Sequence, residues 1–116
     1  MIKELLEFCN ADFRFPRAEW FVHKDMKVYV RNTYKAIYAE NKICKTITIA
    51  TIEVDSPGQK LGTSFIDILH AFHNKECTYI ESVHTPYLRK WLINNSYLLN
   101  YSQGEGETSS DFYKYK

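Results

Sequence analysis

The sequence has almost no net charge and few cysteines. Fifteen Lys and Arg residues stand against fourteen Asp and Glu residues, which gives a formal charge of +1. No overall field would therefore draw the chain onto nucleic acid or an anionic membrane, and nucleic acid is disfavoured as a partner. The number of cysteines is odd, and no two of them form a CxxC pair: they are Cys9, Cys44 and Cys77. This pattern argues against a disulfide framework and a zinc site. We expect three small buried thiols in a reducing, cytoplasmic setting.

Long apolar runs are also missing. No stretch approaches the roughly 20 residues that a membrane span needs, and the charged N-terminal segment MIKELLEFCN is not a signal peptide. The length of 116 residues suits one domain, and 45% hydrophobic with 25% charged residues is typical of globular proteins. We expect a single soluble domain over residues 1–116, and the association of two copies stays open.

Hydrophobic periodicity predicts a mixed α/β (α+β) domain. Residues 2–9 have helical spacing, whereas 13–20 show no clear period and are expected to form a loop or a short helical turn. Residues 27–31 and 34–39 predict a hairpin that turns at Asn32 and Thr33. Further strands are expected over 46–54, 77–83, 97–101 and 111–116, the last at a sheet edge, with helices over 61–73 and 85–94. The strand–helix–strand unit at 46–83 should be parallel and right-handed.

The strand at 46–54 changes parity part-way along. In a regular strand Ile47 and Ile49 would lie on one face and Ile52 on the opposite face, and the change falls at Ala50 and Thr51. One extra residue in the ladder would produce this pattern, which predicts a β-bulge. A strand buried on both faces would explain it equally well.

Glycine is scarce, yet two of the four glycines lie within PGQKLGTS, residues 57–64, between this strand and the next helix. A strand that turns into a helix through glycines directs backbone N–H groups toward the positive end of the helix dipole, where a phosphate can bind. Lys60, Thr63 and Ser64 add a cation and two hydroxyls. The alternative is a turn at Gly58, with Gly62 allowing close packing. Neither a Walker loop nor GxGxxG is present.

Together with its surroundings, this loop resembles the acetyl-CoA loop of the GNAT superfamily of N-acetyltransferases. In that family a bulged strand is followed by [RQ]-G-x-G-x-[GA] and a helix. Gly58 and Gly62 fall on the first and last glycines, while Pro57 replaces Arg or Gln and Lys60 replaces the middle glycine. The stretch TYIESVHTPYLRKWLINNSYLL, residues 78–99, is similar to the family's next strand and helix.

The resemblance implies a GNAT-like mixed sheet with a central parallel strand pair, flanking helices and a shortened N-terminal part. It implies acetyl-CoA as the cofactor and a primary amine as the acceptor, on a protein lysine, a protein N-terminus or a small molecule. The activity would be an acetyl-CoA-dependent N-acetyltransferase. The implied cofactor-binding residues are Ile52, Val54, Gly58, Gln59, Lys60, Leu61, Gly62, Thr63 and Ser64.

The amine must lose a proton, and three residues near the point where the strands would part are candidate bases. These are Glu53, Glu81 and His84, since a buried carboxylate or an imidazole titrates in a useful range. Each also suits an ordinary structural role, as a polar strand residue or near a helix N-cap.

The family's general-acid tyrosine falls on Leu92, so Tyr97 or Tyr87 would have to take that role. Leu92, Lys60 and the short N-terminal part leave an alternative open: a catalytically inactive GNAT-fold protein that acts as a binding or inhibitory partner of another protein. His70 and His73 have a spacing that suits a metal, but no third ligand is near, so a solvated helix face and no metal site are expected.

Overall fold

The computed structural model describes residues 2–55, 61–100 and 110–116. In these ranges the helices are α1 (Ile2–Asn10), α2 (Leu61–Phe72) and α3 (Pro86–Asn94), with a short 3-10 turn, η1 (Tyr38–Glu40). The strands are β1 (Arg17–His23), β2 (Met26–Ile37), β3 (Lys42–Val54), β4 (Cys77–Val83), β5 (Leu98–Asn100) and β6 (Ser110–Tyr115). The predicted mixed α+β architecture is confirmed.

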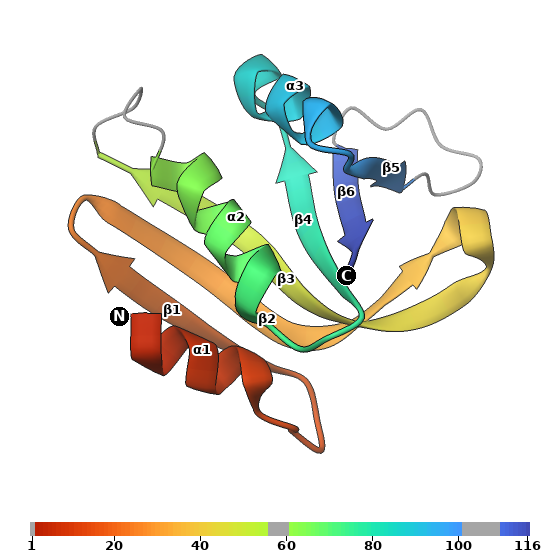
Figure 1. The fold of residues 1–116 in the computed structure, drawn as a ribbon, viewed down its shortest axis with the longest axis horizontal. Coiled ribbons are helices and arrows are strands. Elements are labelled where there is room, and N and C mark those ends of the chain that lie inside the picture. The colour runs from red at the N-terminus through yellow and green to blue at the C-terminus, as the bar shows by residue number, and fades with distance from the viewer. Residues whose placement is uncertain (1, 56–60, 101–109) are drawn as a thin grey trace.

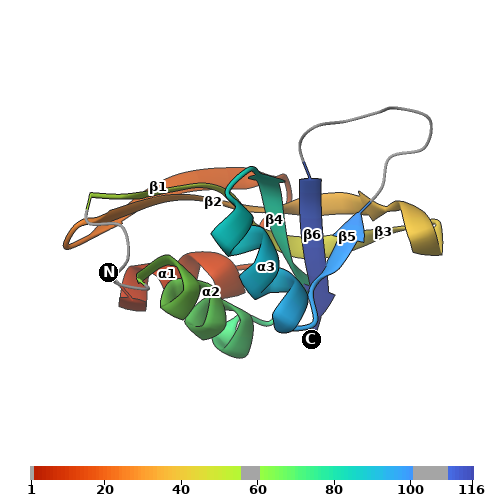
Figure 2. The same cartoon turned by 90° about the horizontal axis from the view of Figure 1, so that it is seen from above.

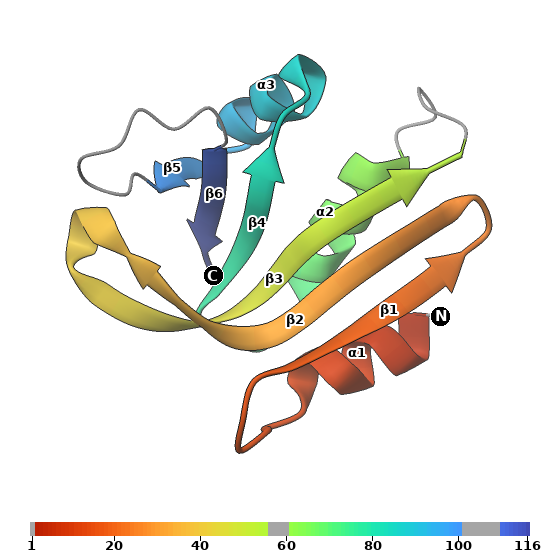
Figure 3. The same cartoon turned by 180° about the vertical axis from the view of Figure 1, so that it is seen from behind.

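The strands form one six-stranded sheet in the order β1-β2-β3-β4-β6-β5, and the helices lie on one of its faces (Figures 1 and 2). β3 and β4 are parallel and joined through α2, as the strand–helix–strand pattern predicts. The other neighbours pair antiparallel. We call the opposite side of the sheet, which no helix of the described residues covers, the helix-free face (Figure 3).

The predicted turn at Asn32 and Thr33 is wrong, because both residues lie within the long strand β2. Asn32 is buried, and its Nδ2 donates to the carbonyl oxygens of Phe8 and Ala11 at 3.0 Å each. These bonds satisfy carbonyls at the C-terminal end of α1 that lack partners within the helix. A tertiary role thus overrides the turn preference of asparagine.

The partner of β2 is β1, in a region that the sequence predicts to be a loop or helical turn. The two strands pair from Arg17 opposite Asn32 to His23 opposite Met26, and Lys24 takes a positive φ of 53° in the turn. Only Phe21 of β1 is buried, so the strand has no alternating hydrophobic pattern of its own. Pairing with β2 creates the strand.

The prediction of an edge strand at the C-terminal end is also wrong. β6 lies between β4 and β5, and β5 forms the edge. Phe112 and Tyr113 are both buried, on opposite faces, because β6 carries packing on each side. Alternation in this strand reflects two buried faces of different composition.

The main core lies between the sheet and the helices. It combines strand residues such as Val30, Ile49 and Ile80 with Leu5 of α1 and Leu69 of α2, all at most 2% exposed. Burying each such side chain contributes roughly 1.5–3 kcal/mol. This packing holds α2 against β3 and β4.

A second cluster lies on the helix-free face. It contains Ile37, Cys44, Cys77, Tyr79 and Tyr113. The β2–β3 hairpin bends so that its tip reaches β5 (Figure 3), where Asn100 Nδ2 donates to the Ala36 carbonyl at 2.9 Å. All three cysteines are buried, as the sequence predicts.

Candidate functional site

The predicted β-bulge in β3 is confirmed. Tyr29 of β2 pairs with Thr51, but the next residue, Val30, pairs with Ile49, which leaves Ala50 as the extra residue on β3. Ile47 and Ile49 therefore face the helices before the bulge, and Ile52 packs against the same core after it. The parity change in the sequence is the signature of this bulge.

β3 and β4 separate at the same level. Their pairing runs only from Thr46 opposite Cys77 to Ile49 opposite Ile80. β4 has an irregularity of its own between Ile80 and Val83, where Ser82 takes a positive φ of 51°. Both strands thus leave the parallel ladder together, and the space between them opens toward their C-terminal ends.

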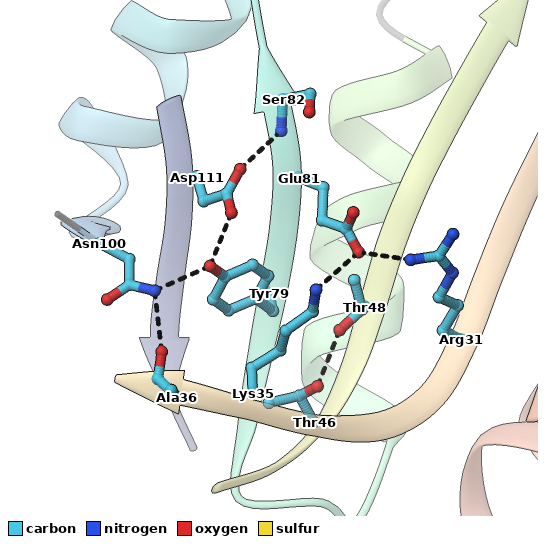
Figure 4. Close-up of polar contacts among 10 residues, drawn as sticks. All are labelled: Arg31, Lys35, Ala36, Thr46, Thr48, Tyr79, Glu81, Ser82, Asn100 and Asp111. Carbon is cyan, nitrogen blue, oxygen red and sulfur yellow. Dashed lines mark hydrogen bonds and ion pairs between the residues drawn. The ribbon is translucent and has the colours of Figure 1, made fainter. Parts of the chain in front are cut away.

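The irregular backbone at Ser82 is held by a series of hydrogen bonds on the helix-free face. The Ser82 backbone N–H donates to Asp111 Oδ1 at 2.9 Å, and the Tyr79 hydroxyl donates to Asp111 Oδ2 at 2.8 Å (Figure 4). Asn100 Nδ2 donates in turn to the Tyr79 hydroxyl at 2.8 Å. Burial raises the pKa of Tyr79 above its ordinary value, so the phenol stays protonated as a donor.

A cavity of about 330 Å³ lies where the strands part. We call it the cleft. Its volume is within the range of small-molecule sites. The cleft is lined by Ile49, Ala50, Thr51, Ile52, Ile80, Glu81, Ser82, Val83, His84, Thr85 and Leu88. Apolar side chains together with a few polar groups suit an organic ligand.

The structure brings some of the predicted catalytic residues to the cleft and leaves others away from it. Glu81 and His84 line the cleft. Glu53 is exposed, lies opposite Lys27 in the β2–β3 register and does not line the cleft. Tyr97 is buried with its ring 6.1 Å from His70, and burial raises its pKa. Tyr97 is not among the lining residues.

The predicted cofactor loop is described only in part. Gly58, Gln59 and Lys60 lie outside the described residues. Leu61, Gly62, Thr63 and Ser64 form the first turn of α2, and Ile52 lines the cleft while Val54 does not.

Gly62 is not required by packing among the described residues. A Cβ added there would meet Ile52 Cγ2 at 3.8 Å, which is an ordinary van der Waals contact. The same contact places the first turn of α2 beside a residue that lines the cleft. Close packing of helix and strand therefore does not explain this glycine.

Two cations converge on Glu81 at the edge of the cleft (Figure 4). Arg31 Nη1 and Lys35 Nζ each lie 3.0 Å from Glu81 Oε1, and the Glu81 side chain is 18% exposed. Glu81 is therefore paired with two cations rather than left as an isolated carboxylate. The predicted site did not include these two cations. Alternation along 26–37 places Arg31 and Lys35 on one face, but the expected turn at Asn32 interrupts that pattern.

The predicted solvated helix face at His70 and His73 is wrong. His73 is 2% exposed, and both imidazoles bond to the Thr78 hydroxyl at 2.7 Å. His73 Nδ1 accepts from the Lys75 backbone N–H at 3.0 Å, so Nε2 carries the proton and donates to Thr78. Burial lowers the pKa of His73 to about 3.

No family model, curated protein or solved structure matches this chain. Within the described residues, no three His, Cys, Asp or Glu side chains are arranged to hold a metal ion. The helices of the same residues all lack the length and apolar character that membrane crossing requires. Function must therefore be inferred from the geometry of the cleft.

Proposed function

We propose that this chain is a GNAT-like domain that binds acetyl-CoA and transfers the acetyl group to a primary amine. One observation carries the proposal: β3 and β4 pair over four residues each and then part to bound a 330 Å³ cleft beside the first turn of α2. Ligands of open α/β sheets bind outside the carboxyl ends of parallel strands. The cleft occupies such a position.

The first turn of α2 suits the diphosphate of coenzyme A. Its backbone N–H groups lie at the positive end of the helix dipole and need acceptors from outside the helix. Gly62 leaves the backbone accessible, and its packing among the described residues gives no other reason for a glycine. The exposed Ser64 adds a hydroxyl donor.

The cleft suits the thioester arm. Ile49, Ile80 and Leu88 give it apolar walls that exclude water, and the bulge at Ala50 interrupts the ladder so that backbone groups of β3 are available to a ligand. When bound, acetyl-CoA supplies the activated acyl group. The chain would contribute positioning: backbone groups of β3 at the bulge would hold the carbonyl, and the residues that line the cleft would orient the amine.

The amine must be neutral to react, and two residues of the cleft can take its proton. His84 is exposed and forms no ion pair among the described residues, whereas Glu81 is paired with Arg31 and Lys35. His84 is therefore the better candidate for the base. Glu81 is better suited to orient the amine.

One observation favours the alternative, an inactive binding or inhibitory protein of the same fold. Leu92, at the position where the resemblance places a general-acid tyrosine, is fully buried in the core. No side chain at that position can protonate a leaving thiolate. Tyr87 is exposed on α3 and does not line the cleft.

Thermal unfolding with acetyl-CoA, coenzyme A or ATP tests cofactor binding. A ligand specific for the native state at 100 times its Kd stabilises it by about 2.7 kcal/mol, which corresponds to a rise of several degrees in Tm. We expect this rise with both coenzyme A species and not with ATP. Gly62→Asp should abolish it by placing a carboxylate against the diphosphate, whereas Phe72→Asp, at the exposed far end of α2, should not.

Turnover separates the two proposals. With a panel of primary amines, the enzyme should release coenzyme A, and His84→Ala should reduce kcat more than Glu53→Gln does. Cofactor binding without turnover on any amine would support the inactive alternative. Absence of any shift in Tm with either coenzyme A species would refute the acetyl-CoA proposal.

A further inference from the structure

Arg31 and Lys35, which we call the cationic pair, reach over β3 from β2 and meet Glu81 at the edge of the cleft (Figure 4). Both side chains lie on the helix-free face, because side chains alternate along β2 and Val30, next to Arg31, packs into the main core on the other face. The Arg31 side chain is 41% exposed and that of Lys35 is 26% exposed. A ligand in solution can therefore reach both.

The cationic pair carries one more positive charge than its carboxylate neutralises. Both contacts go to the same atom, Glu81 Oε1. Asp111 does not supply the missing charge, since it accepts from Tyr79 and the Ser82 backbone and no ion pair joins it to either cation in the described part of the chain. One positive charge is left for a ligand.

Donors for such a ligand remain available. A guanidinium has five N–H donors and an ammonium has three. Among contacts of the described residues, Arg31 uses one of them, to Glu81, and Lys35 likewise uses one. Several donors of the two side chains therefore have no acceptor among the described residues.

Aromatic rings hold both cations in place. Arg31 Cζ lies 5.5 Å from the ring centroid of Tyr29, and Lys35 Nζ lies 5.2 Å from that of Tyr79. The Tyr29 ring in turn packs at 4.9 Å from that of Trp20. Cations fixed over rings lose little conformational entropy when an anion binds, so the arrangement is organised before the ligand arrives.

We propose that the cationic pair binds an anionic group, a carboxylate or a phosphate, on the molecule that brings the amine to the cleft. The anion binds Arg31 and Lys35, while Glu81, which lines the cleft, attracts the ammonium group of the same molecule. The acceptor is thus a primary amine with an anionic group a few bonds away. The identity of this molecule as an acceptor rests on the proposed acetyl transfer, but its binding does not.

Matched pairs of amines test the proposal by direct binding. The probes are 2-aminoethyl phosphate against ethanolamine and β-alanine against propylamine, titrated at constant ionic strength and followed by backbone amide shifts without any coenzyme. We expect at least one anionic member to bind ten-fold or more tightly than its neutral partner, with shifts centred on Arg31, Lys35 and Glu81. The two pairs distinguish phosphate from carboxylate.

Variants locate the binding. Arg31→Gln and Lys35→Gln should each remove most of the preference for the anionic member, whereas Lys42→Gln, on the β2–β3 hairpin, should leave it intact. Circular dichroism checks that each variant is folded. Equal binding of charged and neutral amines, or a preference that survives the double Arg31→Gln, Lys35→Gln change, overturns the proposal. If the parent protein does not bind acetyl-CoA, only the proposed function is overturned, since these titrations need no cofactor.

Discussion

Arg31 of β2 and Glu81 of β4 form an ion pair at 3.0 Å that spans the intervening strand β3. The pair lies beside the bulge at Ala50, because Arg31 is opposite Thr48 and Tyr29 is opposite Thr51. It therefore links β2 to a residue of β4 that lines the cleft, at the level where backbone pairing between β3 and β4 has ended.

This ion pair should contribute more than a surface pair. A double-mutant cycle with Arg31→Gln and Glu81→Gln should give a coupling energy of about 1 kcal/mol in urea unfolding, since Glu81 is largely shielded from water. The control is Lys45 with Asp12, 3.5 Å apart and 47% and 87% exposed, for which we expect a coupling close to zero. Equal coupling in both cycles would contradict the expected difference.

Asn32→Ala should lower the free energy of unfolding by about 2 kcal/mol. The change leaves the carbonyls of Phe8, which is buried, and Ala11, which is partly buried, without the amide that now donates to them at 3.0 Å. Chemical denaturation measures the loss. Asn94→Ala, at an exposed position of α3, is the matched control and should stay within about 0.5 kcal/mol of the parent. A loss no greater than that of the control would mean that Asn32 does not stabilise α1.

Gly62→Ala should stabilise the protein in the absence of ligand, by up to about 1 kcal/mol, because alanine favours the helix and its Cβ meets only an ordinary contact. Ser64→Ala in the same turn should change stability by a few tenths of that amount. If the glycine serves a ligand, the stabilised variant should bind coenzyme A more weakly. Destabilisation by Gly62→Ala would instead indicate that packing requires the glycine.

Stability should fall on mild acidification because of His73. Burial lowers its folded pKa to about 3, below the ordinary value near 6.5. The unfolded chain therefore binds a proton that the folded chain does not, and stability present above about pH 6.5 is lost as the pH falls toward 3, at up to about 1.4 kcal/mol per pH unit.

Urea unfolding between pH 7 and pH 5 measures this slope. His73→Gln should flatten it, whereas the same change at the exposed His23 should leave it as in the parent. An unchanged slope in His73→Gln would show that another group is responsible. The absolute stability of the variant is a separate matter, because glutamine need not preserve the bond to Thr78.

The sequence predicted the elements whose patterns are local and strong. α2 and β4 begin and end close to where periodicity places them, and the parity change at Ala50 located the bulge. β1 could not be predicted in this way, because six of its seven residues are exposed and pairing with β2 alone makes it a strand.

The candidate site was predictable only where it depends on neighbouring residues in the chain. Glu81 lies near the end of a recognisable strand and His84 directly follows it, and both line the cleft. The cationic pair is about 50 residues earlier, and its contact with Glu81 depends on strand order and register, which no local pattern encodes. Asn32 had to be placed in a strand rather than a turn before that register could be found.

The three thiols offer a way to observe how the two clusters open. Cys9 is in the main core, and Cys44 and Cys77 are in the second cluster on the helix-free face. Burial raises the pKa of Cys9 and of Cys77 to about 12, so the native protein should resist alkylating reagents at both residues. Pulse alkylation of the thiols, read out by peptide mass, would then time the exposure of each cluster separately, with no engineered residue needed.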